Sequence, residues 1–266
     1  MNEKQRKILI VVGIIAIIYI LIALFFLKDD KDELNDHVVT LILTPRIRLQ
    51  YHDDVWTRTF PSSTDEESIY RVYDNNAYVG DYYMMYNKYI TGFNIFQKEN
   101  DKKVNYYIYD RAHQILAVRK DTDINVIDFS TKDMTDLDTL KDILNNVGIS
   151  SDMENLYRRQ VEIDYDNDGK KEIIYMFSNA FDDRSTSDKA FTYVVIEKND
   201  KYQVIYEDVR EASEIYNICV PYLQAVIDLR KNKKYTLIFG CEYYSEIGTS
   251  SIVYGEQNSK YKTLLK

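Results

Sequence analysis

Four acidic side chains are concentrated in one short segment, 164–172, which has the sequence DYDNDGKKE. The carboxylates stand at positions 1, 3, 5 and 9 of this segment, and a glycine at position 6 permits a sharp backbone turn. Calcium takes about six to eight oxygen ligands, and a tight loop with this spacing can bring several of them to one centre. The predicted ligands are the side chains of Asp164, Asp166, Asp168 and Glu172 and the main-chain carbonyl of Lys170. We therefore expect a structural Ca²⁺ site, and the alternative is an acidic, solvated turn.

The residues flanking this loop alternate like strands, and Tyr175 stands at position 12, where an EF-hand loop needs a bidentate glutamate. A loop of this kind between two strands resembles the FG-GAP (VCBS-type) repeats of integrin α-chains and many bacterial surface proteins. In that family the pattern D-x-D-x-D-G-x-x-[DE] binds calcium. The resemblance is strong over the loop and its flanks and looser over the rest of 160–266. It implies calcium-stabilised strand repeats and specifies no activity.

The chain after residue 160 contains a second copy of this pattern. VEIDYDNDGKKEIIYMF aligns with AVIDLRKNKKYTLIFGC, which places Asp164 over Asp228 at a shift of 64 residues, and Lys201 aligns with Lys260 at a shift of 59. The second copy replaces the other acids and the glycine by Arg230, Asn232, Lys233 and Thr236. A cation at a ligand position opposes metal binding, so we expect the second loop to be structural. Two repeats cannot close a propeller, which leaves a two-sheet sandwich or an open pair of blades.

The predicted fold class is mainly β, in the α+β class, with a β-rich domain over 37–130, a helical connector over 131–159 and the two strand repeats over 160–266. Short β-branched and tyrosine-rich segments separated by turn residues predict antiparallel hairpins. The strands expected are 38–43, 55–60, 68–73, 77–84, 104–109, 114–120, 124–129, 161–164, 171–177, 190–198, 201–207, 225–229, 235–241, 250–255 and 260–265. Segment 208–222 fits a helix or a strand.

Two helices are expected in the connector. Thr135 begins a pattern that resembles a capping box, apolar residues from Leu137 to Val147 then fall on one helical face, and Gly148 stands where a C-terminal cap belongs. A similar capping pattern at Ser151 predicts a short second helix that ends near Arg159.

Residues 8–27 form a run of 20 uncharged and mostly aliphatic residues, which is long enough to span a bilayer as a helix. We expect a single-pass anchor with a cytoplasmic tail at 1–7 and a charged linker at 28–36. Three basic residues precede the run and two follow it among acids, so the positive-inside rule places the N-terminus inside and the C-terminal domain outside the cytoplasm. The residues after the run make a poor signal-peptide cleavage site.

The net charge and the lack of known catalytic motifs in the sequence limit the classes of function that we expect. A formal net charge of −9 disfavours nucleic acid as a partner. No nucleophile elbow, phosphate loop or dinucleotide fingerprint is present in the sequence, so the interpretation leans away from an enzyme. We expect a surface protein that binds a protein or glycan or supports an envelope complex. The alternatives are a cell-envelope glycan hydrolase with an unrecognised acidic site and a ligand sensor that acts through a membrane partner.

The chain has two cysteines, Cys219 and Cys241. Outside the cytoplasm they could form a disulfide. One pair in a chain of this size is not a disulfide framework, and two buried thiols are the favoured expectation.

Overall fold

The computed structural model describes residues 38–43, 47–59, 68–87, 93–98, 105–107, 115–149, 156–180, 189–213, 218–242 and 251–265. The chain divides into two units, Met1–His37 and Val38–Lys266, and all described residues belong to the second. The predicted tail, anchor and linker over 1–36 therefore lie outside the described residues. Within the described ranges, no helix has the length and apolar character that crossing a membrane requires.

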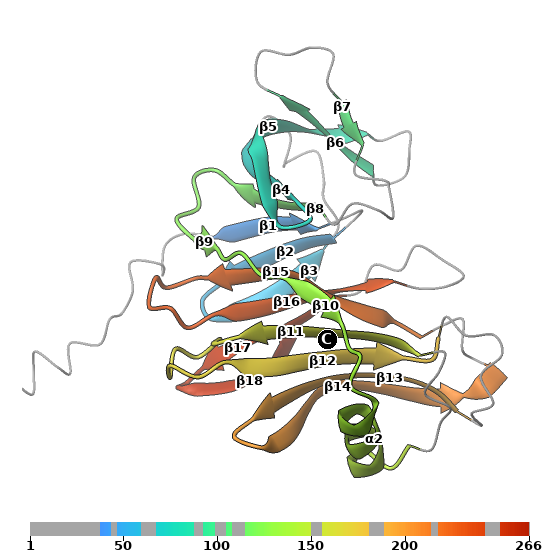
Figure 1. Cartoon of the computed structure of the whole chain (residues 1–266). Coiled ribbons are helices and arrows are strands. Elements are labelled where there is room, and N and C mark those ends of the chain that lie inside the picture. The colour runs from blue at the N-terminus through green and yellow to red at the C-terminus, as the bar shows by residue number, and fades with distance from the viewer. Residues whose placement is uncertain are drawn as a thin grey trace, which may run out of the picture. The chain divides into compact units, whose positions relative to one another are not determined.

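The described part of the chain is mainly β, with antiparallel sheets and one helix, which confirms the predicted class at that level (Figure 1). The first sheet has the strand order β3-β2-β1-β8-β4-β5-β6-β7. Its strands are β1 (Val39–Leu43), β2 (Ile47–His52), β3 (Val55–Thr59), β4 (Ile69–Asp74), β5 (Ala77–Asn87), β6 (Phe93–Lys98), β7 (Asn105–Tyr107) and β8 (Ile115–Arg119). Two-residue turns with left-handed backbone, at Asp53–Asp54 and Asn75–Asn76, join β2 to β3 and β4 to β5.

The remaining strands form two five-stranded sheets with orders β10-β11-β12-β13-β14 and β18-β17-β16-β15-β9. Their strands are β9 (Asn125–Val126), β10 (Thr131–Asp133), β11 (Tyr157–Ile163), β12 (Glu172–Ser178), β13 (Lys189–Lys198), β14 (Lys201–Glu211), β15 (Val220–Asp228), β16 (Thr236–Glu242), β17 (Ser251–Gln257) and β18 (Lys260–Leu265). In both sheets the neighbouring strands are antiparallel. Each sheet therefore consists of one short strand followed by a four-stranded meander.

The two five-stranded sheets share one hydrophobic core. Ile174, Met176 and Val194 of one sheet pack in the same buried cluster as Leu237 and Phe239 of the other. Side chains from two sheets interdigitate in this way in a β-sandwich. Helix α2 (Leu137–Asn146) lies over the opposite face of the β10–β14 sheet and adds its own apolar residues to a separate core cluster (Figure 1).

The N-cap of α2 is Asp136 rather than the predicted Thr135. The Asp136 carboxylate accepts hydrogen bonds from the backbone N–H groups of Asp138 and Thr139, both at 3.1 Å, and so satisfies two free donors of the first turn. Leu140, Ile143 and Leu144 are buried as the periodicity predicts. Gly148 follows the helix with a φ of 74°.

Several predicted boundaries were wrong. The second helix does not reach Arg159, because β11 begins at Tyr157 and pairs with β12 over its whole length; residues 151–155 lie outside the described residues. Thr131–Asp133 is a strand in a region expected to be helical. Strands β2 and β6 were not predicted, and the ambiguous segment contains the end of β14 and the start of β15.

Cys219 and Cys241 form a disulfide, so the expectation of two free thiols was wrong. The antiparallel register of β15 and β16 pairs Pro221 with Cys241 and Val220 with Glu242, which brings the Cα atoms of the two cysteines to 5.1 Å. That separation lies within the range that a disulfide spans. The bond cross-links the two strands at one end of the second hairpin.

Candidate metal centre

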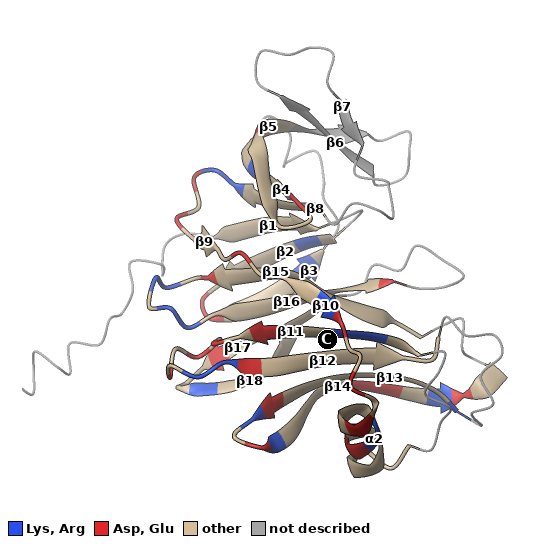
Figure 2. Cartoon of the chain, viewed as in Figure 1, with Lys and Arg blue, Asp and Glu red and all other residues tan. Residues whose placement is uncertain are grey.

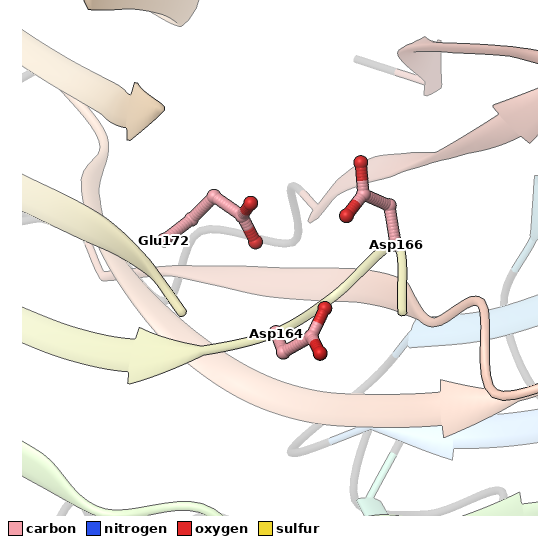
Figure 3. A group of neighbouring side chains, drawn as sticks. All are labelled: Asp164, Asp166 and Glu172. Carbon is pink, nitrogen blue, oxygen red and sulfur yellow. The ribbon is translucent and has the colours of Figure 1, made fainter. Parts of the chain in front are cut away.

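The predicted site lies in the loop between β11 and β12, and strand ends position its outer residues. Asp164 follows the last residue of β11, Glu172 is the first residue of β12, and Asp166 lies in the loop between them. Carboxylate oxygens of these three residues lie within 4.8 Å of one another. Figure 3 shows the carboxylates of Asp166 and Glu172 pointing toward each other, with that of Asp164 beside them.

Hydrogen bonds from the backbone shape this loop. The Asp164 carboxylate accepts from the N–H groups of Asp168 at 3.1 Å and Gly169 at 3.0 Å, and Asp168 Oδ1 accepts from the N–H of Lys170 at 2.9 Å. Asn167 and Gly169 have φ values of 59° and 86°, in the left-handed region. The glycine of the motif thus stands where the backbone needs it.

The four predicted carboxylate ligands do not all converge. Asp168 lies outside the triad of converging carboxylates, and its side chain is joined to the others through a lysine. Lys170 contributes its backbone N–H to Asp168, while its ammonium group extends to Asn199 Oδ1 at 3.3 Å. Among the predicted carboxylate ligands, those that the structure brings together are therefore Asp164, Asp166 and Glu172.

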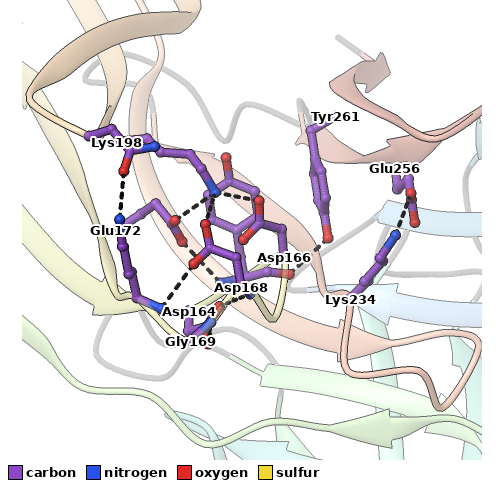
Figure 4. Close-up of polar contacts among 12 residues, drawn as sticks. Asp164, Asp166, Asp168, Gly169, Glu172, Lys198, Lys234, Glu256 and Tyr261 are labelled. Atoms are coloured by element: carbon purple, nitrogen blue, oxygen red, sulfur yellow. Dashed lines mark hydrogen bonds and ion pairs between the residues drawn. The ribbon is translucent and has the colours of Figure 1, made fainter.

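Lys198, the last residue of β13, is the principal site residue that sequence reasoning missed. Its ammonium group contacts Glu172 at 2.9 Å, Asp168 at 2.9 Å and Asp166 (Figure 4). The lysine comes 26 residues after Glu172 in the chain, and the pairing of β12 with β13 brings it to the loop. The only signal in the sequence was its place at the end of the predicted strand 190–198, with two residues between it and the next predicted strand.

Burial and the neighbouring charges set the electrostatics of the site. Burial raises the pKa of Glu172, whose side chain is 2% exposed, and the Lys198 ammonium offsets this only in part. Desolvation acts to lower the pKa of Lys198, but its bonds to three carboxylates outweigh that effect and raise the pKa above its usual value. The same ammonium group, together with the Lys170 N–H, lowers the pKa of Asp168.

These residues suit a cation. With all groups ionised, the loop carries four carboxylates, and the Lys198 ammonium group contacts three of them, which leaves an excess of negative charge. Asp166 Oδ1 is buried and accepts no hydrogen bond from the described residues. A hard oxygen donor without a partner is what a calcium ion needs. Binding of the ion would require the Lys198 ammonium to move aside, since it contacts two of the same carboxylates, those of Asp166 and Glu172.

The β15–β16 loop repeats the backbone pattern of the first loop at a shift of 64 residues. Asp228 accepts from the N–H groups of Asn232 at 3.2 Å and Lys233 at 3.0 Å, and Asn232 Oδ1 accepts from the N–H of Lys234 at 3.0 Å. Lys231 and Lys233 have φ values of 53° and 61°. The first loop is rich in acids and the second in bases (Figure 2).

In the second loop the residue equivalent to Asp166 is Arg230, and it points to another partner. Its guanidinium group contacts Asp54 Oδ1 at 2.7 Å, in the β2–β3 turn of the first sheet. Gln257, at the position equivalent to Lys198, donates from Nε2 to the main-chain oxygen of Asp54 at 2.9 Å. The Arg230 contact joins this loop to the β2–β3 turn, in keeping with a structural loop, and the Gln257 contact joins the end of β17 to the same turn.

No family model matches this chain, and no curated protein or solved structure matches it either.

Proposed function

We propose that this protein is a single-pass, membrane-anchored surface protein whose extracytoplasmic β domain carries a structural calcium ion in the 164–172 loop. In this proposal the domain is a binding or scaffold module of the cell envelope and has no catalytic role. The resemblance of the loop and its flanking strands to FG-GAP (VCBS-type) repeats belongs to the same proposal. Residues 8–27 are its anchor, and the N-terminal tail lies inside.

The comparison of the two loops carries the calcium proposal. The second loop adopts the same hydrogen-bond pattern with only Asp228 and Asn232 as side-chain acceptors. Glu172 accepts one further backbone hydrogen bond in the first loop, from the N–H of Tyr165 at 3.3 Å. The second loop forms without an acid at either position, so Asp166 and Glu172 are not required for the shared backbone, although their burial and mutual repulsion have a cost. A bound divalent cation accounts for their presence, and so does the unpartnered Oδ1 of Asp166.

The disulfide supports the extracytoplasmic location. Disulfides persist in oxidising compartments and are rare in the cytosol of mesophilic organisms. The Cys219–Cys241 bond lies within the same unit as the candidate calcium loop. The positive-inside bias around residues 8–27 is independent support for an outside location of this unit.

Calorimetric titration of the full-length protein with Ca²⁺ in detergent, with a melting curve beside it, tests the calcium proposal. We expect one ion to bind and to raise the melting temperature, because a ligand that binds only the folded state stabilises it. Asp166→Ala/Asp168→Ala should lose both effects. Burial raises the pKa of Glu172, so protons compete with the ion there and affinity should fall as the pH is lowered toward that pKa.

Asp121→Ala/Asp123→Ala is the matched control, since it removes two exposed aspartates outside the loop and should bind calcium like the wild type. If neither the wild type nor the control binds calcium, the loop is an acidic turn closed by Lys198 and the calcium proposal fails. Protease added to intact cells tests the topology separately. Cleavage of the 38–266 unit only after cell lysis would refute the extracytoplasmic location.

A further inference from the structure

A pocket of about 550 Å³ lies at the end of the β15–β16 hairpin opposite its loop, where the disulfide joins the two strands. Its walls come from the β4–β5 turn, segment 129–131, the first residues of β11, the first half of β15 and the last residue of β16. The pocket thus draws on all three sheets. Its volume falls within the roughly 300–1,000 Å³ usual for small-molecule sites.

Two amide side chains in this wall have one end bonded and one end free. Gln224 is 2% exposed, and its Nε2 donates to the main-chain oxygen of Ile115 at 3.0 Å. Asn76 Nδ2 donates to Asp128 Oδ1 at 3.2 Å and to the main-chain oxygen of Phe129 at 3.3 Å. These bonds fix the orientation of both amides, because only the nitrogen can donate.

The amide oxygens that remain, Gln224 Oε1 and Asn76 Oδ1, are buried and receive no hydrogen bond from the described residues. A buried acceptor without a donor costs about 1–3 kcal/mol, so native structures rarely leave one unexplained. Both residues line the same pocket. Both oxygens are covered in this structure, so a ligand with hydrogen-bond donors would reach and satisfy them after a shift of the side chains that cover them.

Gly240 of β16 leaves room for two side chains of the pocket wall, those of Tyr222 and Gln224. A Cβ atom at this position would lie 2.5 Å from Tyr222 Oη and 2.7 Å from Gln224 Oε1. The phenol of Tyr222 and the free oxygen of Gln224 therefore converge over bare backbone, and any larger residue would displace them. This convergence puts a hydroxyl group and an unsatisfied acceptor side by side.

The pocket also supplies donors, aromatic surface and balanced charge. Burial, and after it the nearby Glu242 carboxylate, raises the pKa of Tyr157 and of Tyr222, so both phenols keep their protons and can donate. Arg159 and Glu242 bring one charge of each sign to the lining. Such a lining suits a neutral ligand that both donates and accepts hydrogen bonds and has an apolar face for the rings.

We infer that this pocket binds a saccharide unit of an envelope glycan. The hydroxyl groups of a sugar donate to Gln224 and Asn76 and accept from the tyrosines, and its C–H face packs on the aromatic rings. Among the described residues that line the pocket, Glu242 is the only carboxylate, and glycoside hydrolysis generally needs two. The pocket therefore binds a glycan without cleaving it. This inference rests on the proposed extracytoplasmic function and identifies its ligand.

Calorimetric titration of the full-length protein with chitotetraose and with maltotetraose tests the inference. The protein should be held in a polyoxyethylene detergent, because glycosidic detergents would themselves present a sugar. We expect at least one saccharide to bind. Tyr222→Phe, which keeps the ring and loses the hydroxyl, should weaken binding about fivefold, the effect of one hydrogen bond. Gly240→Ala should weaken it roughly tenfold or more, since the new methyl group pushes Tyr222 and Gln224 into the pocket.

Tyr202→Phe is the matched control, because Tyr202 packs beside the α2 face of the other sheet and should leave binding unchanged. Binding of neither saccharide by the wild type overturns the inference, and so does binding of the amine probe trilysine in place of a saccharide. Equal affinity of Tyr222→Phe and the wild type would also overturn it, and this variant decides the matter if Gly240→Ala does not fold. If no saccharide binds but calcium binds and the domain lies outside the cytoplasm, the proposed function stands and only this inference fails. If the domain lies inside the cytoplasm, the proposed function is refuted even if the purified protein binds sugar.

Discussion

The β11–β12 and β15–β16 loops have the same backbone and different side-chain chemistry. Both are closed by an aspartate that accepts from two backbone N–H groups, and both have left-handed residues at equivalent positions. In the first loop the remaining acids converge with Lys198. In the second loop Arg230 reaches out to Asp54 in another sheet.

The comparison shows that different residues determine the backbone shape of the loop and its binding partner. The shape needs one aspartate, one further side-chain oxygen and tolerance of left-handed backbone. The side chain at the position of Asp166 or Arg230 is then free to vary, and its charge decides whether the loop gathers a cation or bonds to a neighbouring sheet. Substitutions in the two hairpins can test this division.

The largest expected effect on stability comes from a difference between the two hairpins that carry these loops. Only the second hairpin has a disulfide among the described residues, and its two cysteines are 22 residues apart. Cross-linking a chain at that separation stabilises the folded state by about 3 kcal/mol in the chain-entropy model. Cys219→Ala/Cys241→Ala should lower the free energy of unfolding by that amount in a urea titration. An unchanged titration midpoint would mean that the β15–β16 pairing is stable without the bond.

Lys198→Met should have the next largest effect on stability. The variant should be less stable than the wild type without calcium and should gain more stability than the wild type when calcium binds. Without metal, the variant leaves the buried Glu172 and the partly buried Asp166 without the cation that neutralises them. Because solvent reaches the lysine and screens these contacts, we expect the free energy of unfolding to fall by only about 2 kcal/mol. With calcium present, the loss of a competing ammonium group should tighten binding of the ion. The measurement is a melting curve with and without calcium. A variant that binds calcium no better than the wild type would show that Lys198 does not compete for the site.

Gly169 and Lys233 occupy equivalent positions with φ values of 86° and 61°. A Cβ at Gly169 would meet no atom within 4 Å, so only the backbone conformation opposes a side chain there. Gly169→Ala should therefore cost about 1 kcal/mol. Lys233→Gly should change stability by less than about 0.5 kcal/mol, because relief of strain is offset by the extra entropy of the unfolded chain. Urea titration of both variants tests whether the loops have the same conformational demand.

The sequence predicts this common backbone well, because its determinants are local. The positions of Asp164, Gly169 and Glu172 in the motif, and the shift to Asp228, predict two strand–loop–strand units that the structure contains. Strand β2, which was not predicted, has an equally local pattern, since Ile47, Leu49 and Tyr51 are buried and alternate with more exposed residues.

The sequence does not predict contacts that depend on how strands pair. Lys198 reaches the acidic loop only through the register of β12 and β13, and Arg230 meets Asp54, 176 residues away in the chain, only through the packing of two sheets. The disulfide likewise depends on the β15–β16 register. No short-range pattern specifies these partners. The sequence thus predicts the acidic residues of the candidate site but not the lysine that contacts them.

The smallest expected effect concerns the contact of the second loop with the first sheet. Arg230 bonds to Asp54 at 2.7 Å and to Tyr51 Oη at 3.4 Å, but both charged groups are partly exposed, so Arg230→Met should cost only about 0.5–1 kcal/mol. A global measurement would barely resolve it, whereas hydrogen exchange in the β2–β3 turn should increase locally. Lys231→Met removes a neighbouring and more exposed ion pair and should leave exchange in that turn unchanged. Equal exchange in both variants would show that Arg230 does not hold the turn, and the contact from Gln257 at the end of β17 would then be the one that holds it.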